Sequence, residues 1–97
     1  MASPDSVFKA LADPTRREIL RLLRSGPKSS GEIAEQFSSA WPTISRHLAI
    51  LRDAELVVAE RNGLNIVYEL DTTVFQETAE HLLSWINPRG SNGKRRP

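Results

Sequence analysis

The chain contains no cysteine and only two histidines among its 97 residues. The absence of cysteine excludes a disulfide framework, a thiolate metal site and a thiol nucleophile. No apolar run approaches the ~20 residues of a membrane-spanning helix, and the N-terminus lacks the basic region and apolar core of a signal peptide. We therefore expect a cytoplasmic protein that does not insert into a membrane.

Groups for catalysis are equally scarce. The sequence has no Gly-rich phosphate loop, and its histidines, His47 and His81, form no set with a nucleophile and a carboxylate. We therefore expect no enzymatic activity, no catalytic residue and no cofactor.

Charge is distributed unevenly, although the formal net charge is only +1. Residues 1–66 are close to neutral, residues 67–86 contain acids but no Lys or Arg, and residues 87–97 contain four basic side chains and no acid. A surface for nucleic acid must therefore be local. The length and the 39% hydrophobic content fit one domain, which we place at residues 1–86, followed by a basic flexible tail at 87–97.

Capping motifs predict the first three helices. Ser3 and Asp13 each precede a proline at the first position of an expected helix. In the second of these helices, over residues 15–24, apolar and arginine positions are separated at helical spacing. Ser29 and Glu32 then form the S-x-x-E capping box of a short third helix.

The next helix, predicted at residues 41–52, has the two faces that a DNA-reading helix needs. Ile44, Leu48 and Leu51 recur at helical spacing and form a packing side. Thr43, Ser45 and Arg46 lie on other faces near the helix start. Hydroxyls can bind phosphate, and arginine can bridge guanine O6 and N7. A solvated surface helix would have a similar composition, so this alternative stays open from the helix alone.

A β-hairpin follows, because the β-rich runs at 57–61 and 66–70 flank an Asn-Gly dipeptide. Two short helices, a tight turn and a two-stranded wing at 57–70 are typical of the winged helix-turn-helix. We predict a mainly α fold with four helices, this hairpin and a last helix. Arg61 at the wing tip can enter a narrow minor groove, and a plain surface turn is the alternative.

Three segments resemble a known family: residues 8–17 (FKALADPTRR), 44–48 (ISRHL) and 51–57 (LRDAELV). Together they resemble the ArsR family of winged-helix repressors, and within it the SdpR-like autorepressor branch, over most of the chain. The resemblance implies a homodimer that places two recognition helices in adjacent major grooves of double-stranded operator DNA.

The predicted DNA-binding residues combine the residue pattern with the family's contact positions. They are Ser30, Trp41, Pro42, Thr43, Ser45, Arg46, His47, Arg61 and Asn65. Ser30 is included because N–H groups at the start of the third helix can hold a phosphate. Burial against a neighbour is the alternative for Trp41, and a packed or capping role is the alternative for His47.

In the family, the first and last helices form the dimer interface. This agrees with more apolar side chains than one small domain needs. The predicted interface residues are Val7, Phe8, Leu11, Val74, Phe75, Thr78, Leu82 and Trp85. An intramolecular core face is the alternative for the last helix, which Thr72 or Thr73 is expected to cap.

The sequence departs from the family pattern at several positions. Ala40 replaces a capping Ser or Thr before the recognition helix, so Ser39 is expected to shift the cap, and Glu55 replaces a Gly at the helix end. The metal sites of the family need cysteines, or acids and histidines on the last helix. The matching positions here hold Thr72, Val74, Trp85 and Pro88, so we expect no metal site.

Three functions remain in competition. The leading one is a homodimeric repressor that reads an operator through helix 41–52 and wing 57–70 without a metal, with a regulatory protein partner as one route to relief. The alternative is a dimeric sensor that responds to a small apolar ligand or a partner protein at the dimer interface. The third is a protein-interaction module with weak DNA binding, which the near-neutral charge of residues 1–66 motivates.

Overall fold

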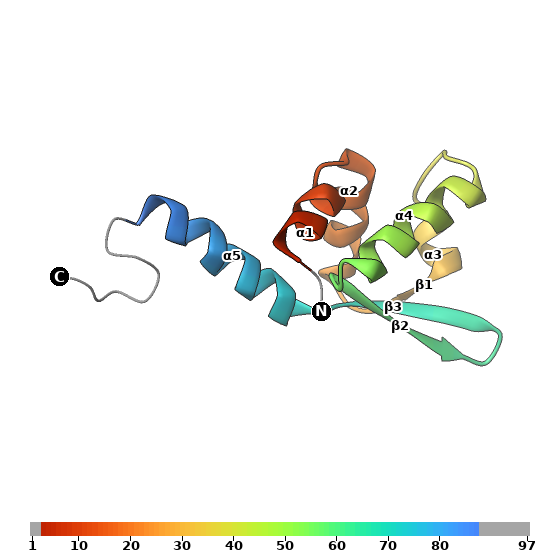
Figure 1. The fold of residues 1–97 in the computed structure, drawn as a ribbon. Helices are drawn as coiled ribbons and strands as arrows, with labels where there is room; N and C mark the ends of the chain where they lie inside the picture. Colours follow the sequence, from red (N-terminus) through yellow and green to blue (C-terminus); the bar gives the residue numbers. More distant parts are fainter. Residues whose placement is uncertain (1–2, 88–97) are drawn as a thin grey trace.

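The computed structural model describes residues 3–87, which form five helices and three strands (Figure 1). The helices are α1 (Pro4–Leu11), α2 (Pro14–Leu23), α3 (Ser30–Ala34), α4 (Trp41–Asp53) and α5 (Thr72–Ile86). The strands are β1 (Lys28–Ser29), β2 (Val57–Asn62) and β3 (Asn65–Leu70). The predicted order of four helices, a hairpin and a last helix is confirmed, and β1 is an addition. The predicted tail, apart from Asn87, lies outside the described residues.

Side-chain caps start α1, α2 and α3 where the sequence predicts them. The Ser3 hydroxyl accepts from the Ser6 N–H, and the Asp13 carboxylate accepts from two N–H groups of the first turn of α2. Ser29 and Glu32 make both bonds of the capping box at α3. Each cap satisfies N–H groups that have no partner inside the helix.

The cap predicted for α5 is wrong. Asp71 is the N-cap, and its carboxylate accepts from the Thr73 N–H at 3.1 Å. Thr72 and Thr73 are already helical, so neither can cap the helix that contains them. Asp71, which directly follows β3, is held in place because its own N–H donates to the carbonyl of Leu56, the residue before β2.

The end of α4 is a Schellman motif built around a non-glycine residue. Glu55 has φ 61°, and its N–H donates to the Arg52 carbonyl, while the Leu56 N–H donates to the Leu51 carbonyl. Leu51 and Leu56 are both fully buried, which supplies the apolar contact typical of this motif. The prediction that Glu55 occupies a left-handed glycine position is confirmed.

The wing is an antiparallel hairpin whose strands pair from Val57 with Leu70 to Asn62 with Asn65. Both strands are one residue longer at the turn than predicted, so the connection is Gly63 and Leu64 alone. Gly63 has φ 66°, and Leu64 is not among the residues with positive φ, which is the pattern of a type II′ turn. β1 pairs with the other side of β3, so the strand order is β1-β3-β2.

The core is apolar and lies between the helices α1 to α4 and the sheet. The described residues bury no polar or charged side chain. The buried residues are Val7, Ala10, Ile19, Leu20, Leu23, Ile33, Ile44, Leu48, Leu51, Ala54, Leu56, Val57 and Tyr68. None of them belongs to α5, which instead extends away from the other helices (Figure 1).

Candidate nucleic-acid interface

Helix α4 separates into a buried and an open side as the sequence predicts. Ile44, Leu48 and Leu51 are buried in the core. The predicted contact residues of its first two turns are exposed, and they are Trp41, Pro42, Thr43, Ser45 and Arg46. A helix fixed from one side by the core offers its other side to a groove as a rigid unit.

The N-terminus of α4 has no side-chain cap. Ala40 is the N-cap residue and makes no side-chain hydrogen bond, so the expected shift of the cap to Ser39 does not occur. The N–H groups of Thr43 and Ile44 both donate to the Ala40 carbonyl, at 3.0 and 3.2 Å. The positive end of the helix dipole is therefore not neutralised by a carboxylate or covered by a hydroxyl, which suits a phosphate oxygen.

Trp41 lies on the surface at the first position of α4. Its side chain is 48% exposed, so the interpretation that buries it against a neighbour does not hold within this chain. An exposed indole beside Pro42 and an open helix end can contact a sugar or a thymine methyl.

His47 has a structural partner, in keeping with the packed alternative. It is half-buried, and its Nδ1 lies 3.2 Å from Nη1 of Arg16. A guanidinium only donates, so Nδ1 must accept, and the neutral ring then carries its proton on Nε2. This bond fixes the ring on α4 and leaves only Nε2–H available to another acceptor.

Arg16 is the residue that the sequence reasoning missed as a positioning group. Its Nε and Nη2 donate to the carbonyls of Ala10 and Lys9, at 2.7 and 2.9 Å, while Nη1 reaches His47. One side chain of α2 thus joins the last turn of α1 to α4. Arg17 makes a similar bond from Nη1 to the Leu11 carbonyl at 2.8 Å. The segment Asp-Pro-Thr-Arg-Arg, residues 13–17, could have indicated this role, but the sequence analysis used it only for the family resemblance.

Asp13 supports this junction electrostatically. Burial alone would raise the pKa of its carboxyl, but the backbone N–H donors of Arg16 and Thr15 outweigh it, with further help from the charge of Arg16 and, in its protonated form, from His47. The pKa of Asp13 is therefore held below its ordinary value. The carboxylate is therefore ionised at neutral pH, and its negative charge stabilises the N-terminus of α2 through the helix dipole.

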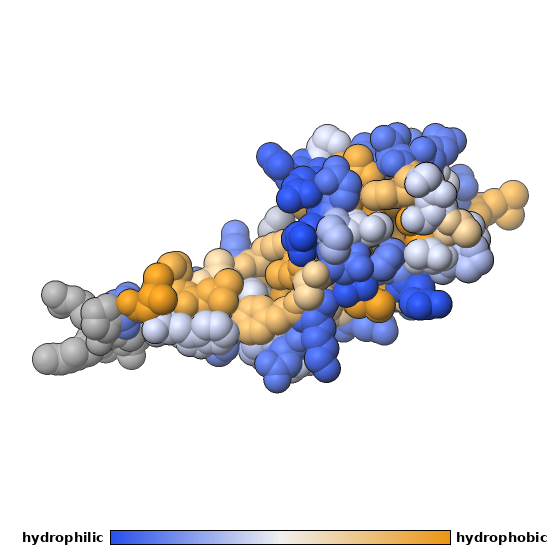
Figure 2. Space-filling view, turned by 90° about the horizontal axis from the view of Figure 1, so that it is seen from above, coloured by the Kyte–Doolittle hydropathy of each residue, from blue (hydrophilic) through white to orange (hydrophobic). Residues whose placement is uncertain are grey.

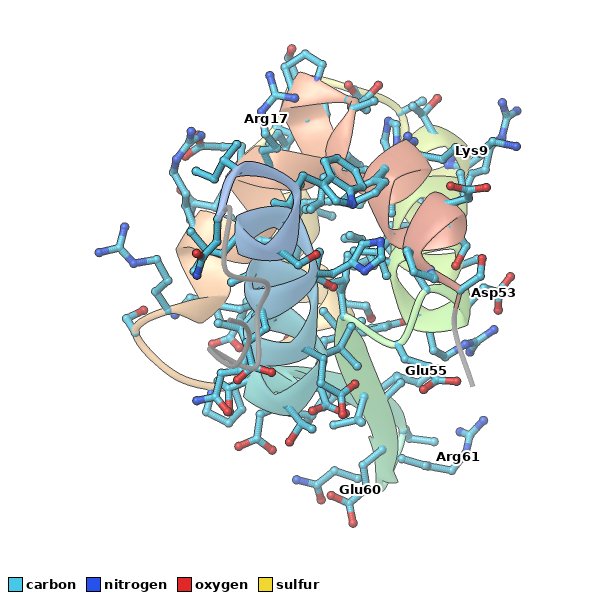
Figure 3. All side chains as sticks on the ribbon, turned by 60° about the vertical axis from the view of Figure 1, so that its left-hand side comes forward. Lys9, Arg17, Asp53, Glu55, Glu60 and Arg61 are labelled. Atoms are coloured by element: carbon cyan, nitrogen blue, oxygen red, sulfur yellow. The ribbon has the colours of Figure 1, made fainter. Side chains whose placement is uncertain are left out.

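The wing extends beyond the helices and presents its predicted residues to solvent. Arg61 on β2 and Asn65 at the start of β3 are both exposed. Figure 3 shows Arg61 pointing outward near the far end of β2, on a different side from Glu60. Leu64 at the turn is 99% exposed, which sequence reasoning did not single out. Ser30 is the first residue of α3 and is half-buried beside β1.

Apolar side chains remain uncovered on α5. Trp85 and Ile86 are 62% and 77% exposed, and Leu82 and Leu83 are also exposed. Figure 2 shows this apolar surface along α5, away from the mostly polar body. The ring of Phe8 on α1 meets the Trp85 ring edge-on at 5.6 Å, and His81 lies 5.2 Å from Trp85.

The remaining predicted interface residues are buried to different extents. Leu11, Val74, Phe75 and Thr78 are half-buried, as is Phe8. Val7 is 2% exposed and belongs to the core, so its side chain offers no surface to a second copy. Its place in the predicted interface is corrected, because the apolar side of α1 that carries Val7 packs inward against the protomer's own core.

Two kinds of site are not found within residues 3–87. No group of three or more His, Asp or Glu side chains there could hold a metal ion. No helix in this part of the chain is long and apolar enough to cross a membrane.

Comparison with known proteins agrees with this architecture. Residues 13–58 match the sequence model of the bacterial regulatory protein, arsR family. The chain is 48% identical over 88 residues to the transcriptional repressor SdpR of Bacillus subtilis, covering 91% of this chain and 97% of that one. It is 39% identical over 66 residues to an arsenical resistance operon repressor of Staphylococcus xylosus, covering 68% of this chain and 64% of that one.

Comparison with solved structures also finds ArsR family regulators. The crystal structure of the ArsR family transcriptional regulator RHA00566 superposes with a TM-score of 0.76 and 31% identity, over 89% of this chain and 92% of that one. The proteins it is similar to are named as regulators and repressors, not as enzymes. The sequence match covers 91% of the chain, and the structural match covers 89% of it. The chain therefore belongs to the ArsR family of bacterial regulatory proteins, with a winged helix-turn-helix fold.

Proposed function

We propose that this chain, a DNA-binding transcriptional repressor of the ArsR family, acts as a homodimer that reads an operator through α4 and the wing. Helix α4 enters the major groove, where Arg46 contacts a base edge and Thr43 and Ser45 contact phosphate or base. Arg61 and Asn65 of the wing reach the adjacent minor groove or its backbone, and Ser30 reaches a phosphate. His47 has the smaller role, because Arg16 already occupies one of its ring nitrogens.

One observation carries this proposal: the exposed side of α4 ends at an uncapped N-terminus with Trp41, Thr43, Ser45 and Arg46 around it. Pro42 has no N–H, and the N–H groups of Thr43 and Ile44 donate to the Ala40 carbonyl, so the Trp41 N–H and the positive end of the helix dipole remain for an external anion. Helix α4 also lies within residues 13–58, which match the family's sequence model, and a relative is named as a repressor. A regulator of DNA acts where the chromosome is, which places it in the cytoplasm.

Replacement of Arg46 by Ala tests the reading face. We expect a loss of roughly 1–3 kcal/mol in binding to the specific operator, with much less loss on scrambled duplex. Fluorescence anisotropy with duplex from upstream of the chain's own coding region, titrated with salt, measures both. Arg52→Ala is the matched control, because Arg52 is exposed in the last turn of the same helix.

Two outcomes would contradict this assignment. Equal losses for Arg46→Ala and Arg52→Ala would mean that α4 contributes only general charge. Weak binding with a shallow salt dependence, on every duplex tested, would instead favour the protein-interaction module.

Dimerisation through α1 and α5 is supported by the exposed apolar side chains of α5. An isolated helix of this length is marginal in water, and α5 buries no residue in its own protomer. Trp85, Ile86 and Leu82 would be covered by a second copy, with Phe8 packed beside them. Two copies related by a two-fold axis would set the spacing between their recognition helices.

Replacement of Trp85 by Glu tests the interface. We expect sedimentation to show a monomer, and operator affinity to fall with it, because a charge would be buried without a partner. Leu64→Glu is the matched control for sedimentation only, since Leu64 is 99% exposed in the β2–β3 turn and Figure 1 shows the wing and α5 extending to opposite sides. A Trp85→Glu variant that stays dimeric would remove α5 from the interface.

We further propose that this repressor works without a metal. The chain has no cysteine, and the only histidine of α5, His81, stacks on Phe8 and meets the Trp85 ring edge-on. Addition of Zn²⁺ or a chelator should then leave operator affinity unchanged in the same anisotropy assay. A relative named as an arsenical resistance operon repressor makes this a necessary measurement.

A further inference from the structure

A pocket of about 380 Å³ lies where α2 faces the end of α1 and the start of α5. Its apolar wall consists of Leu11, Leu20, Leu70 and Phe75, the last of which belongs to the first turn and a half of α5. Its polar groups are Thr72, two arginines of α2 and the arginine at the C-cap of that helix. The volume is within the range of ligand sites, about 300–1,000 Å³.

The three arginines, Arg17, Arg21 and Arg24, share one face of α2 because they are four and three residues apart. Like charges at this spacing destabilise a helix, unless something neutralises them. Arg21 is neutralised by Glu18, with 2.9 Å between Nη1 and Oε1. Figure 3 shows Arg17 at the outer end of the helices.

The other two arginines have no counter-ion in the part of the chain that the structure describes. Arg17 donates to a backbone carbonyl, that of Leu11, which carries no full charge. The side chain of Arg24 makes no hydrogen bond or ion pair with any residue from 3 to 87. The neighbouring carboxylate at the start of α5, that of Asp71, is already used as the helix cap. Two positive charges therefore border an apolar wall.

We propose that this pocket binds a small amphipathic anion, with a hydrocarbon or aromatic tail against Leu20 and Phe75 and a carboxylate facing Arg17 and Arg24. Charge complementarity decides between this ligand and a neutral or cationic one, because apolar contact alone would accept all three. The pocket lies at the beginning of α5. Trp85 is ten residues further along, roughly 15 Å at helical rise, so the exposed aromatic surface is a separate feature.

Leu11 and Phe75 also belong to the residues predicted to meet a second copy. A ligand on them could therefore alter how α1 and α5 assemble, which links occupancy to the proposed repressor function. Binding of the anion itself does not depend on that function, and it is measured without DNA.

Isothermal titration of the full chain with octanoate tests the proposal, with octylammonium as a probe of equal length and opposite charge. We expect saturable binding of one octanoate per protomer and no saturable binding of octylammonium. Arg24→Gln should weaken octanoate binding by about fivefold or more. Arg52→Gln is the matched control, because it removes an exposed arginine that does not line the pocket.

Loss of folding would not imitate this result, because Arg24 is exposed at the C-cap of α2 and circular dichroism of the variant checks the helices. Absence of saturable octanoate binding, equal binding of both probes, or unchanged binding in Arg24→Gln would each overturn the proposal. Octanoate that binds only by converting dimer to monomer would show that a second copy is the occupant. Failure of the Arg46 test would overturn operator reading and leave the octanoate result unaffected.

Discussion

The junction made by Arg16 gives the sharpest prediction about stability. Its guanidinium donates to Ala10 O, Lys9 O and His47 Nδ1, at 2.7, 2.9 and 3.2 Å. Replacement by Ala removes three charge-assisted hydrogen bonds and leaves two carbonyls at the end of α1 without this donor. Each such bond is worth about 1.5–3 kcal/mol when shielded and less where water replaces it.

Arg16 is half-buried, so we expect Arg16→Ala to lower the free energy of unfolding by roughly 2–4 kcal/mol. For a domain of this size the fall in melting temperature would be about 10–20 °C. Urea unfolding followed by circular dichroism, at one fixed protein concentration, measures the free energy. The pKa of Asp13 should also rise, because the Arg16 charge is one of the causes that lower it, while the backbone N–H of residue 16 remains as a donor.

Arg17→Ala is the matched control for this measurement. Arg17 is exposed and makes one such bond, to Leu11 O, so its loss should cost only about 0.5–1 kcal/mol. A cost for Arg16→Ala no greater than that for Arg17→Ala would refute the reasoning, because the three bonds would then contribute nothing beyond an ordinary surface arginine. Combination of Arg16→Ala with His47→Ala isolates the bond that joins α2 to α4.

Three further predictions concern the helix ends. Glu55→Gly should be more stable than Glu55→Ala by about 1 kcal/mol in urea unfolding, because both variants remove the side chain and only glycine relieves the strain at φ 61°; equal stabilities would contradict this. Asp13→Asn keeps a cap but removes the charge. The lowered pKa of Asp13 gives the wild type an advantage that is complete above about pH 5 and disappears as the pH falls below 3.8, which unfolding at several pH values measures. Ala40→Asp should stabilise the fold by about 0.5–1 kcal/mol through a new cap on α4, yet weaken operator binding in the anisotropy assay. Stronger binding would show that phosphate does not approach this end.

Much of the fold was predictable because the signals are local. A cap such as Ser29 with Glu32 is complete within one turn, and the hairpin depends on a short run around Gly63. The division of α4 into a buried and an open side follows from the 3.6-residue period alone. The positions of the candidate DNA-binding residues on α4 and the wing were therefore foreseeable.

Other features depend on contacts between distant segments. β1 exists only because Lys28 pairs with Tyr68 of β3, some forty residues later. Asp71 caps α5 because its backbone N–H donates to the Leu56 carbonyl. No local motif around the start of α5 predicts that contact. The three hydrogen bonds of Arg16 likewise join α1, α2 and α4. The sequence therefore shows the motif that contains Arg16 but not which residues Arg16 contacts.

The sequence by itself determined where the helices and the wing begin and end, to within a residue or two, and which residues of α4 stay open. Only the tertiary structure decided how deep each apolar residue lies. It buried Val7 in the core, left Trp85 exposed, and opened a pocket between Leu20 and Phe75. The physical reason is that helical periodicity marks the apolar side of a helix but not what covers it. That is settled by packing between elements far apart in the chain.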